Sequence, residues 1–454
     1  MRIIKFLFIV TLLFCSTGFS QRDRSVSADS SASREIGQLR DEVRLLRAEL
    51  DSLKVSAQNP STDQSNELDQ VEERLEKRLQ ELENKIDAVS RGVAPIAFNP
   101  KMVTAVNFAA RSDNKDVVDP SPGKNVISNR PFLRTVEVEL SSAVDPYASA
   151  FAVISLENEA NADFGIDAEE AYGLIKRLPI LESAPLGLKL KIGKYRASIG
   201  VDNKIHIHDL PWTTRPLIVS RYLGTDHGEF FESGFNPVGM DLDFYLPNPF
   251  PGTTLEMNAD VVRAGDIAIS NANLASSSST PITVRQPAYI GHLNLSKDWS
   301  NVHLINLGAS VYDEEGDYAT RAYGIDLTYK WAPAEERESH SIVAGGEALV
   351  IDHIDSLLNR IHPFGWFGYL QYQTSYWLYL GTRYDWIEEP TNAGVVTRNI
   401  GIYASYYTTE FLRFRLGFEH RLSDIAAQNN LNTILLDVNL VFGSHPTEPY
   451  WVNK

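Results

Sequence analysis

The chain has almost no cysteine: the only one among its 454 residues is Cys15, close to the N-terminus. The remainder must therefore be stable without disulfide bonds. An excess of basic residues is also missing, since 42 Lys and Arg stand against 59 Asp and Glu, for a net charge of −17. This acidity argues against a nucleic-acid partner, because nucleic-acid-binding proteins carry basic patches, and it favours a lumen or loops that attract cations.

Long hydrophobic runs are missing as well, and the mean hydropathy is −0.21, which argues against a bundle of membrane helices. The one apolar run, Phe6 to Phe14, follows the basic residues Arg2 and Lys5 and precedes Gly18-Phe19-Ser20, which fits a signal-peptide cleavage site. It is shorter than the roughly 20 residues that a membrane-spanning helix needs. Residues 1–20 are therefore predicted to be a cleaved signal peptide, and Phe14 before Cys15 argues against a lipoprotein.

A helical pattern follows a linker at 21–33. Within 34–91, apolar residues recur at spacings of three and four, and Asn59-Pro60-Ser61 interrupts the pattern between two helices. Such a seam is typical of a coiled coil. Two interpretations fit it, a helical hairpin folded on itself and an oligomeric coiled coil in the periplasm, of which we favour the second.

Beyond Arg91 the hydrophobic period changes from helical to two. In 411–421, Leu412, Phe414, Leu416 and Phe418 alternate with Arg413, Arg415, Gly417 and Glu419. A soluble sandwich also alternates, but these segments are about ten residues long, as tilted membrane strands require. Aromatic residues gather at the segment ends, which is typical of interfacial girdles, and short linkers alternate with long ones. These aromatic residues are Trp366, Tyr369, Tyr376, Trp377, Tyr384 and Trp386.

The predicted fold is an all-β transmembrane antiparallel barrel over residues 96–447, preceded by the coiled coil and followed by a tail at 448–454. About sixteen strands are expected, an even and porin-sized number. They lie near 100–110, 132–143, 147–157, 167–178, 186–195, 237–247, 252–264, 286–297, 302–313, 319–331, 339–352, 362–373, 375–386, 397–408, 411–422 and 431–442.

One connection is much longer than the others. Arg196 to Pro237 shows no alternation, and a loop of this length in a wide barrel can fold inward and set the aperture. Its His206, His208 and Asp209 place two imidazoles and a carboxylate on one extended edge, which predicts a site for a borderline cation such as zinc. The alternative is a constricting loop whose polar groups hydrogen-bond to one another and to water.

Several segments, taken in order, resemble the family labelled zinc-regulated outer-membrane proteins, or zinc-regulated TonB-dependent outer membrane receptors. The resemblance covers residues 96–447 and rests on Phe98-Asn99-Pro100, Glu169-Glu170-Ala171-Tyr172, Leu186 to Tyr195, Asn203, His206, His208, Arg215-Pro216-Leu217, Tyr222-Leu223-Gly224, Gly239 to Leu246, Arg263 to Asp266 and Val441 to Pro446. It implies a porin-like barrel associated with uptake of zinc or another metal, and it marks Asn203, His206 and His208 as residues of interest.

The leading functional hypothesis is a porin-like outer-membrane channel for small solutes or ions, embedded in lipid and assembled as a homo-oligomer, with a trimer favoured. Charged residues predicted to line its lumen and set its selectivity are Glu137, Glu139, Lys189, Lys191, Arg413, Arg415 and Glu419. The alternatives are a metal-specific receptor and an envelope tether that binds a periplasmic partner through the coiled coil. No required cofactor is expected, and zinc enters only as a ligand or transported ion. An enzyme has the least support, because no nucleophile motif or phosphate-binding loop is recognisable.

Overall fold

The computed structural model divides into two units, residues 1–99 and 100–454. It describes residues 100–117, 129–145, 147–158, 164–177, 185–224, 234–247, 250–269, 286–300, 302–316, 319–333, 339–354, 359–390 and 394–443. The predicted signal peptide, linker, coiled coil and C-terminal tail lie outside the described residues. No helix of the described residues is long and apolar enough to cross a membrane.

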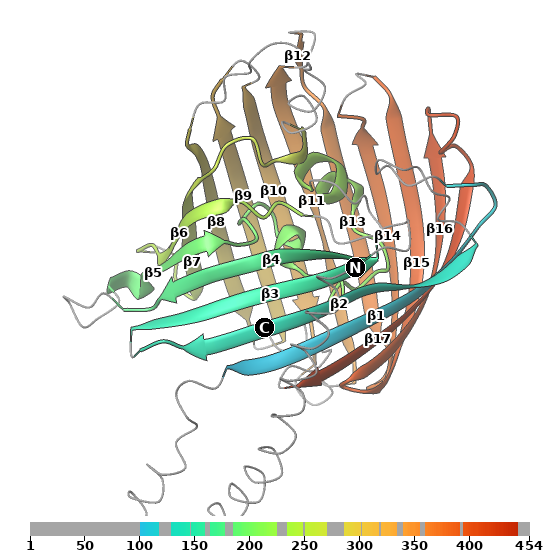
Figure 1. The fold of residues 1–454 in the computed structure, drawn as a ribbon, viewed down its shortest axis with the longest axis horizontal. Helices are drawn as coiled ribbons and strands as arrows, with labels where there is room; N and C mark the ends of the chain where they lie inside the picture. The colour runs from blue at the N-terminus through green and yellow to red at the C-terminus, as the bar shows by residue number, and fades with distance from the viewer. Residues whose placement is uncertain are drawn as a thin grey trace, which may run out of the picture. The chain divides into compact units, whose positions relative to one another are not determined.

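The second unit is one antiparallel sheet that closes on itself, because β1 pairs with both β2 and β17 (Figure 1). The short β12 pairs with the end of β11, ahead of β13, so the wall consists of sixteen strands. The elements are β1 (Lys101–Asp113), β2 (Arg130–Ala143), β3 (Ala148–Asn158), β4 (Phe164–Ile175), β5 (Lys189–Lys194), β6 (Val238–Tyr245), β7 (Thr253–Val262), β8 (Ala288–Trp299), β9 (His303–Glu314), β10 (Thr320–Trp331), β11 (Ser341–Ile354), β12 (Arg360–Ile361), β13 (Phe364–Gln373), β14 (Leu378–Glu388), β15 (Val396–Thr409), β16 (Leu412–Ser423) and β17 (Leu431–Gly443). The predicted closed antiparallel barrel of about sixteen strands is confirmed.

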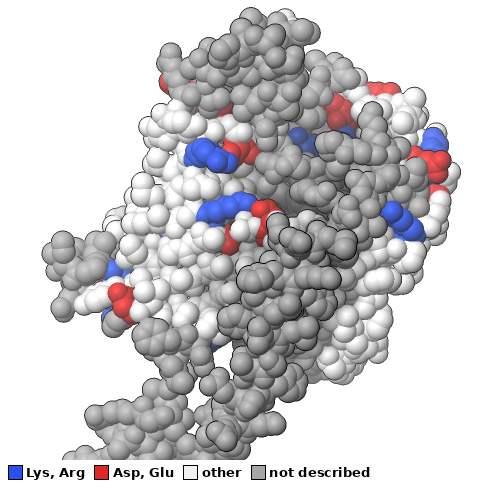
Figure 2. All heavy atoms as spheres, in the orientation of Figure 1, with Lys and Arg blue, Asp and Glu red and all other residues white. Residues whose placement is uncertain are grey.

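The strands face apolar side chains outward and polar ones inward. Along β16, Arg413 and Arg415 are buried inside the barrel, whereas Leu416 is 56% exposed on its outer surface. The same holds on β10, where Ile325 is 64% exposed and Asp326 is buried. On the face drawn in Figure 2, the described outer surface is mainly uncharged. This inside-out arrangement is that of a barrel whose outer wall contacts lipid, since closure leaves no unpaired backbone edge there.

Two sequence predictions differ from the structure in detail. Tyr369, expected in an outer aromatic girdle, faces the lumen, and its ring lies 4.9 Å from that of Trp212. It shares the inward register of Phe367, so the strand's alternation places it there. The strand predicted from residue 186 begins only at Lys189, because Pro185–Gly187 forms a 3₁₀ turn, η1, with Gly187 at φ 68°.

The hydrophobic core lies inside the barrel. We call residues 196–237, between β5 and β6, the inner loop; 196–224 and 234–237 of it are described. It contains the short elements η2 (Asp202–Lys204) and η3 (Val219–Leu223). Apolar loop side chains pack against inward-facing residues of β7 to β11 and β13 to β15. The loop contributes Ile199, Ile205, Ile207, Leu210, Trp212, Leu217, Ile218, Val219, Tyr222 and Leu223, and the wall Val262, Ile290, Tyr312, Leu349, Ile351, Phe367, Ile387 and Tyr403. The loop therefore folds inward, as its length predicts. Its apolar side chains form a dry core that fills part of the lumen.

Candidate functional site: the inner loop and the lumen

Four buried arginines on the barrel wall hold the inner loop by its backbone; we call Arg134, Arg383, Arg413 and Arg415 the arginine wall. Arg134 donates to the carbonyl of Thr213 at 2.6 Å, and Arg413 donates to that of His208 at 2.8 Å. Arg383 donates to Thr214, and Arg415 to Leu210 and Trp212. A loop inside a barrel has no strand partner for its carbonyls, and these guanidinium groups supply the missing donors.

Buried carboxylates balance the charge of the arginine wall. Asp437 lies 3.4 Å from Arg134 and 3.6 Å from Arg413. Asp385 lies 2.8 Å from Arg383 and accepts the backbone N–H of Leu217. Glu419 accepts hydrogen bonds from Thr214, Tyr403 and Asn399. Buried ions need such pairing, because each would otherwise lose its hydration without compensation.

The opposite part of the loop is attached to β11 and closed upon itself. Glu347 accepts the backbone N–H groups of Val201 and Asp202 at 2.7 and 2.6 Å. Gly200 has φ 63°, and a Cβ there would lie 2.2 Å from Glu347 Oε2, so both the backbone conformation and the close approach favour glycine. The fully buried Asn203 donates to the carbonyl of Ala197 and accepts the N–H of Phe235, which joins the two ends of the loop.

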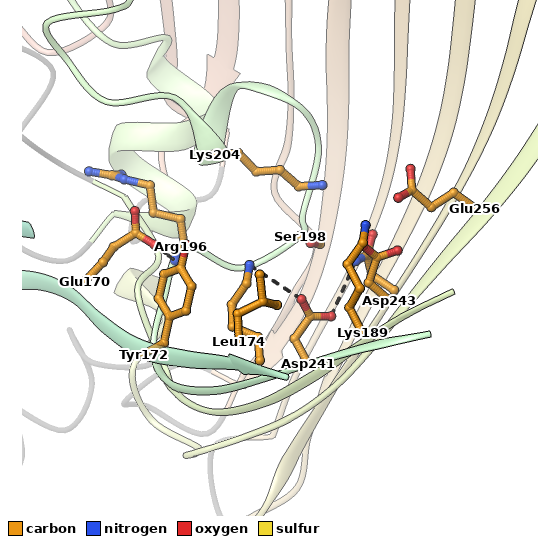
Figure 3. A pocket seen from close by; sticks show the side chains of 12 residues that line it. Glu170, Tyr172, Leu174, Lys189, Arg196, Ser198, Lys204, Asp241, Asp243 and Glu256 are labelled. Carbon is orange, nitrogen blue, oxygen red and sulfur yellow. Dashed lines mark hydrogen bonds and ion pairs between the residues drawn. The ribbon is translucent and has the colours of Figure 1, made fainter. Parts of the chain in front are cut away.

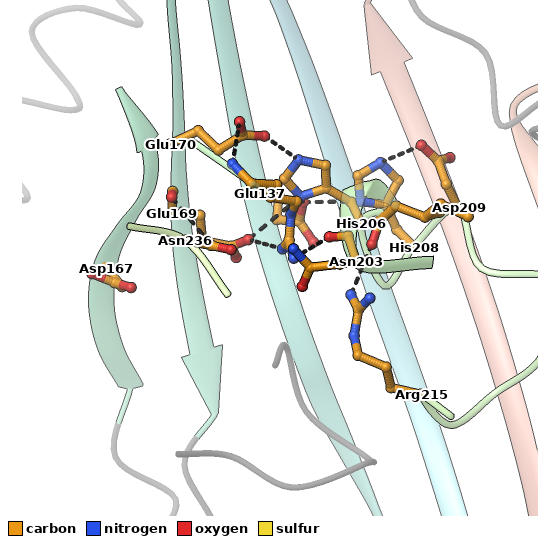
Figure 4. Close-up of polar contacts among 12 residues, drawn as sticks. Glu137, Asp167, Glu169, Glu170, Asn203, His206, His208, Asp209, Arg215 and Asn236 are labelled. Atoms are coloured by element: carbon orange, nitrogen blue, oxygen red, sulfur yellow. Dashed lines mark hydrogen bonds and ion pairs between the residues drawn. The ribbon is translucent and has the colours of Figure 1, made fainter. Parts of the chain in front are cut away.

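Histidines of the loop meet glutamates of the wall (Figure 4). His206 Nδ1 lies 3.3 Å from Glu137 Oε2 and 3.4 Å from Glu169 Oε2, and its Nε2 lies 2.9 Å from Glu170 Oε1. The imidazole of His208 stacks on that of His206, with ring centroids 5.7 Å apart. Its Nδ1 lies 2.9 Å from Glu137 Oε2, and its Nε2 lies 3.5 Å from Asp209 and 3.9 Å from Glu139. We call Glu137, Glu169, Glu170, His206 and His208 the histidine–glutamate cluster.

The carboxylates govern the protonation of both loop histidines. Burial and the charge of Arg196 lower the pKa of His206, but contacts with Glu137, Glu169 and Glu170 outweigh them and hold it well above 6.5. For His208, burial likewise lowers the pKa, while Asp209 and Glu137 raise it, to about 9 overall. In the absence of another cation, the imidazolium forms therefore balance part of the carboxylate charge near neutral pH.

A cavity of about 260 Å³ lies between the inner loop and the wall formed by β4 to β7 (Figure 3). Residues of both signs line it: Glu170, Lys189, Lys191, Arg196, Lys204, Asp241, Asp243 and Glu256, with Tyr172, Leu174, Ser198 and Asn258. We call the strand residues among them the cavity wall. Lys189 pairs with Asp243 at 3.1 Å, and Lys191 lies 3.6 Å from Asp241 and about 5 Å from the rings of Tyr172 and Tyr195. Unlike the arginine wall, this part of the lumen keeps charged groups beside open space.

The seven residues predicted to line the lumen all have inward positions, in three different environments. Arg413, Arg415 and Glu419 are buried against the inner loop. Glu137 and Glu139 lie beside the loop histidines, and Lys189 and Lys191 line the cavity. Of the predicted metal ligands, His206 has two carboxylate oxygens beside one ring nitrogen, whereas Asp209 contacts His208 at the edge of the cluster.

Sequence reasoning missed Arg134, Glu169 and Glu170 because two β-bulges change the direction of side chains. Between β1 and β2 the register shifts so that Arg134 is the extra residue, and between β3 and β4 the extra residue is Glu169. A bulge turns two consecutive side chains to one face, and Glu169 and Glu170 are indeed both buried inside. A strict period of two sends one residue of each pair outward. The motif Glu169-Glu170 was visible, but its common direction was not.

No protein-family model matches the chain. A curated but uncharacterised protein of Aquifex aeolicus is 27% identical over 215 residues, which cover 44% of this chain and 41% of that protein. The chain thus matches less than half the length of this relative. The resemblance to the zinc-regulated family is not confirmed and stays a prediction.

Several solved structures have a similar fold at low identity. An anion-selective porin from Comamonas acidovorans is 11% identical with a TM-score of 0.48, covering 76% of this chain and 99% of that one. The outer membrane channel DcaP of Acinetobacter baumannii is 10% identical with a TM-score of 0.48, covering 76% and 97%. OmpF of Salmonella typhi, in complex with daunomycin, is 9% identical with a TM-score of 0.46, covering 76% and 98%. The class that this chain's own geometry defines is a lipid-facing antiparallel barrel with a loop folded into its lumen.

Proposed function

We propose that this chain is a narrow channel of the bacterial outer membrane, through which small solutes or ions pass between the inner loop and the cavity wall. The observation that carries the proposal is the contrast inside one barrel between a dry, loop-filled half and a hollow lined by charged side chains. Charged side chains that line an open space have a function along a water-filled path, whereas they have none in a packed core. The apolar outer surface supports the membrane location.

The lining of the path supports a preference for small, charged or strongly polar solutes. Lys189 and Lys191 lie beside Asp243 and Asp241 of the neighbouring strand, and Lys204 and Glu256 also line the hollow, so cationic and anionic groups both find partners. In Figure 3, Lys204 extends from the loop, whereas the acidic side chains extend from the strands. A displacement of the loop would change the separation between Lys204 and these acidic side chains, so the aperture depends on how firmly the loop is held.

The test is single-channel conductance of the purified chain in planar bilayers, combined with a cysteine probe. Lys204→Cys places a thiol on the cavity, and Leu416→Cys places one on the outer surface as a matched control. A negatively charged methanethiosulfonate is expected to reduce the Lys204→Cys current to roughly half or less, because it narrows the path and changes its charge. The wild type and Leu416→Cys should keep their current. Openings in groups of three would support the proposed trimer.

Two outcomes would contradict the proposal in different ways. A folded wild-type chain that gives no current in any bilayer would remove the channel. Current that the reagent leaves unchanged in a fully labelled Lys204→Cys variant would keep a channel and move its path away from β4 to β7.

A metal-specific receptor is a second candidate, favoured by one observation: the histidine–glutamate cluster shares Glu170 with the cavity. An ion that enters the cavity would reach these side chains without crossing the dry core. The alternative of an envelope tether depends on the predicted coiled coil, which lies outside the described residues.

A further inference from the structure

We propose that Glu137, Glu169 and His206 form a binding site for one divalent transition-metal ion of the zinc class, which joins the inner loop to β2 and β4. The site goes beyond the proposed channel, because it would bind its ion whether or not the barrel conducts. Its ligands come from three separate parts of the chain, so a bound ion would connect the loop to two wall strands at once.

The donor atoms already have the spacing of ligands around one ion. One atom from each of the three residues lies within 4.8 Å of the others. His206 Nδ1 is 3.3 and 3.4 Å from the two carboxylate oxygens. Ligands bound tetrahedrally at about 2.0–2.1 Å lie roughly 3.3 Å apart, which matches both contacts of His206 Nδ1.

Two of the three proposed ligands, Glu137 and His206, turn donor atoms toward the site that make no hydrogen bond within the described residues. Both carboxylate oxygens of Glu137 and Nδ1 of His206 have no hydrogen-bond partner among the described residues, although Glu137 is fully buried. The contacts of His206 Nδ1 with the oxygens of Glu137 and Glu169 are close but not aligned as hydrogen bonds. Such a geometry is expected when the lone pairs of several donor atoms point toward one common position. Buried polar atoms without partners are costly, and a cation between them would remove that cost.

The surroundings orient His206 as metal-site histidines are oriented. Its Nε2 donates to Glu170 Oε1 at 2.9 Å, which leaves Nδ1 to face Glu137 and Glu169. Arg196 donates to Glu169 at 2.8 Å and so fixes the second carboxylate. A carboxylate behind a ligating imidazole is the usual arrangement around protein-bound zinc. Three ligands of this N/O composition also leave a fourth position for water or a passing solute group.

The charge of the cluster favours a doubly charged ion. Glu137, Glu139, Glu169, Glu170 and Asp209 surround the two histidines, and Arg196 pairs with Glu169. The mixture of imidazole and carboxylate donors selects zinc, cobalt or nickel over magnesium, which prefers oxygen ligands alone. The competing arrangement is an imidazolium at His206 held by three carboxylates with no ion.

Calorimetric titration of the metal-stripped full chain with ZnCl₂ distinguishes a metal site from an imidazolium that the carboxylates hold without an ion. The proposal expects one Zn²⁺ per chain with micromolar or tighter affinity, and no comparable binding of MgCl₂. His206→Gln and Glu137→Gln should each weaken Zn²⁺ binding by about 100-fold or more, and Glu170→Gln, which acts through His206, by about 10- to 100-fold. The matched control is His292→Gln, because His292 also lies inside the barrel but contacts the single carboxylate of Asp326.

Folding of each variant is checked by the shift in gel mobility between heated and unheated samples. If a cluster variant does not fold, the wild type decides alone: X-ray absorption of the zinc-loaded chain should show only N and O ligands at about 2.0–2.1 Å, including one imidazole. The proposal is overturned by a wild type that does not bind Zn²⁺, by cluster variants that bind as tightly as His292→Gln, or by an oxygen-only shell. None of these results depends on current through the barrel, so they leave the channel proposal to its own test.

Discussion

The arginine wall and the cavity wall occupy the same lumen, yet their charged residues have opposite environments. Arg383 is 1% exposed and donates to the backbone of the inner loop, whereas the side chain of Lys189 is 40% exposed beside the cavity. Both types of residue occupy inward positions of alternating strands. The comparison shows that an inward charge in a barrel belongs either to the packing of an internal loop or to a solute path, and that only its partners distinguish the two.

The largest expected difference between the walls is in stability. Arg383→Met removes a buried cation, which leaves Asp385 without its ion-pair partner and the Thr214 carbonyl without the Arg383 donor. The free energy of unfolding should fall by about 3–5 kcal/mol, as when one partner of a buried ion pair is removed. Denaturant unfolding in detergent measures this. Lys189→Met, the matched change on the cavity wall, should cost less than about 1 kcal/mol, because that pair is solvated. Equal losses of unfolding free energy in the two variants would contradict the difference between the arginine wall and the cavity wall.

A second change weakens the hydrogen bonds that join the two ends of the inner loop and leaves the residues of the barrel wall unchanged. Asn203→Ala leaves the buried Phe235 N–H unpaired and leaves the Ala197 carbonyl with the Ile199 N–H alone. A loss of about 1–3 kcal/mol is expected, with noisier single-channel current, because the two ends of the loop separate more easily. The control is Asn294→Ala, whose amide makes one long contact with Ser296. If Asn203→Ala unfolds with the same free energy as this control and shows no more current noise, the Asn203 hydrogen bonds are not needed to hold the loop.

A third change acts on the β11 attachment. Gly200→Ala brings a Cβ against the Glu347 carboxylate in a left-handed conformation, so the carboxylate or the loop must shift and the two hydrogen bonds between them weaken. We expect a loss of about 1–3 kcal/mol and a larger mean conductance. Gly252→Ala has a similar φ of 71° but open space around the new Cβ. It therefore reports the backbone strain alone, and its difference from Gly200→Ala measures the contact with Glu347.

The smallest effect on stability, and the sharpest on selectivity, is expected on the cavity wall. Asp243→Asn removes a negative charge beside Lys189 and should lower the cation-to-anion permeability ratio roughly twofold, measured from reversal potentials in a salt gradient. Unfolding should change by less than about 1 kcal/mol. Asp352→Asn, also in a partly exposed pair with Arg360 but away from the cavity, should leave the ratio unchanged. A shift of equal size in both variants would place selectivity outside β4 to β7.

The candidate site was predictable in its parts and not in its assembly. Alternation placed Arg413, Arg415 and Glu137 inward, and the length of the segment 196–237 marked the loop. The pairing of His206 with Glu169 and Glu170 could not be read from spacing, because it joins residues 36 and 37 positions apart through a bulge. For the same reason, nothing in the sequence separated the loop-binding arginines from the cavity-lining lysines.

The sequence by itself determined which residues alternate, how many strands they make and which face meets lipid, because these depend on a period of two and on the exclusion of charge from hydrocarbon. Only the tertiary structure decided where the inner loop packs, which carboxylate each arginine or histidine meets, and where the lumen stays hollow. Those outcomes depend on register shifts at Arg134 and Glu169 and on contacts between residues more than 100 positions apart, such as Arg383 and Thr214. The local pattern of residues does not indicate contacts between residues so far apart in the chain.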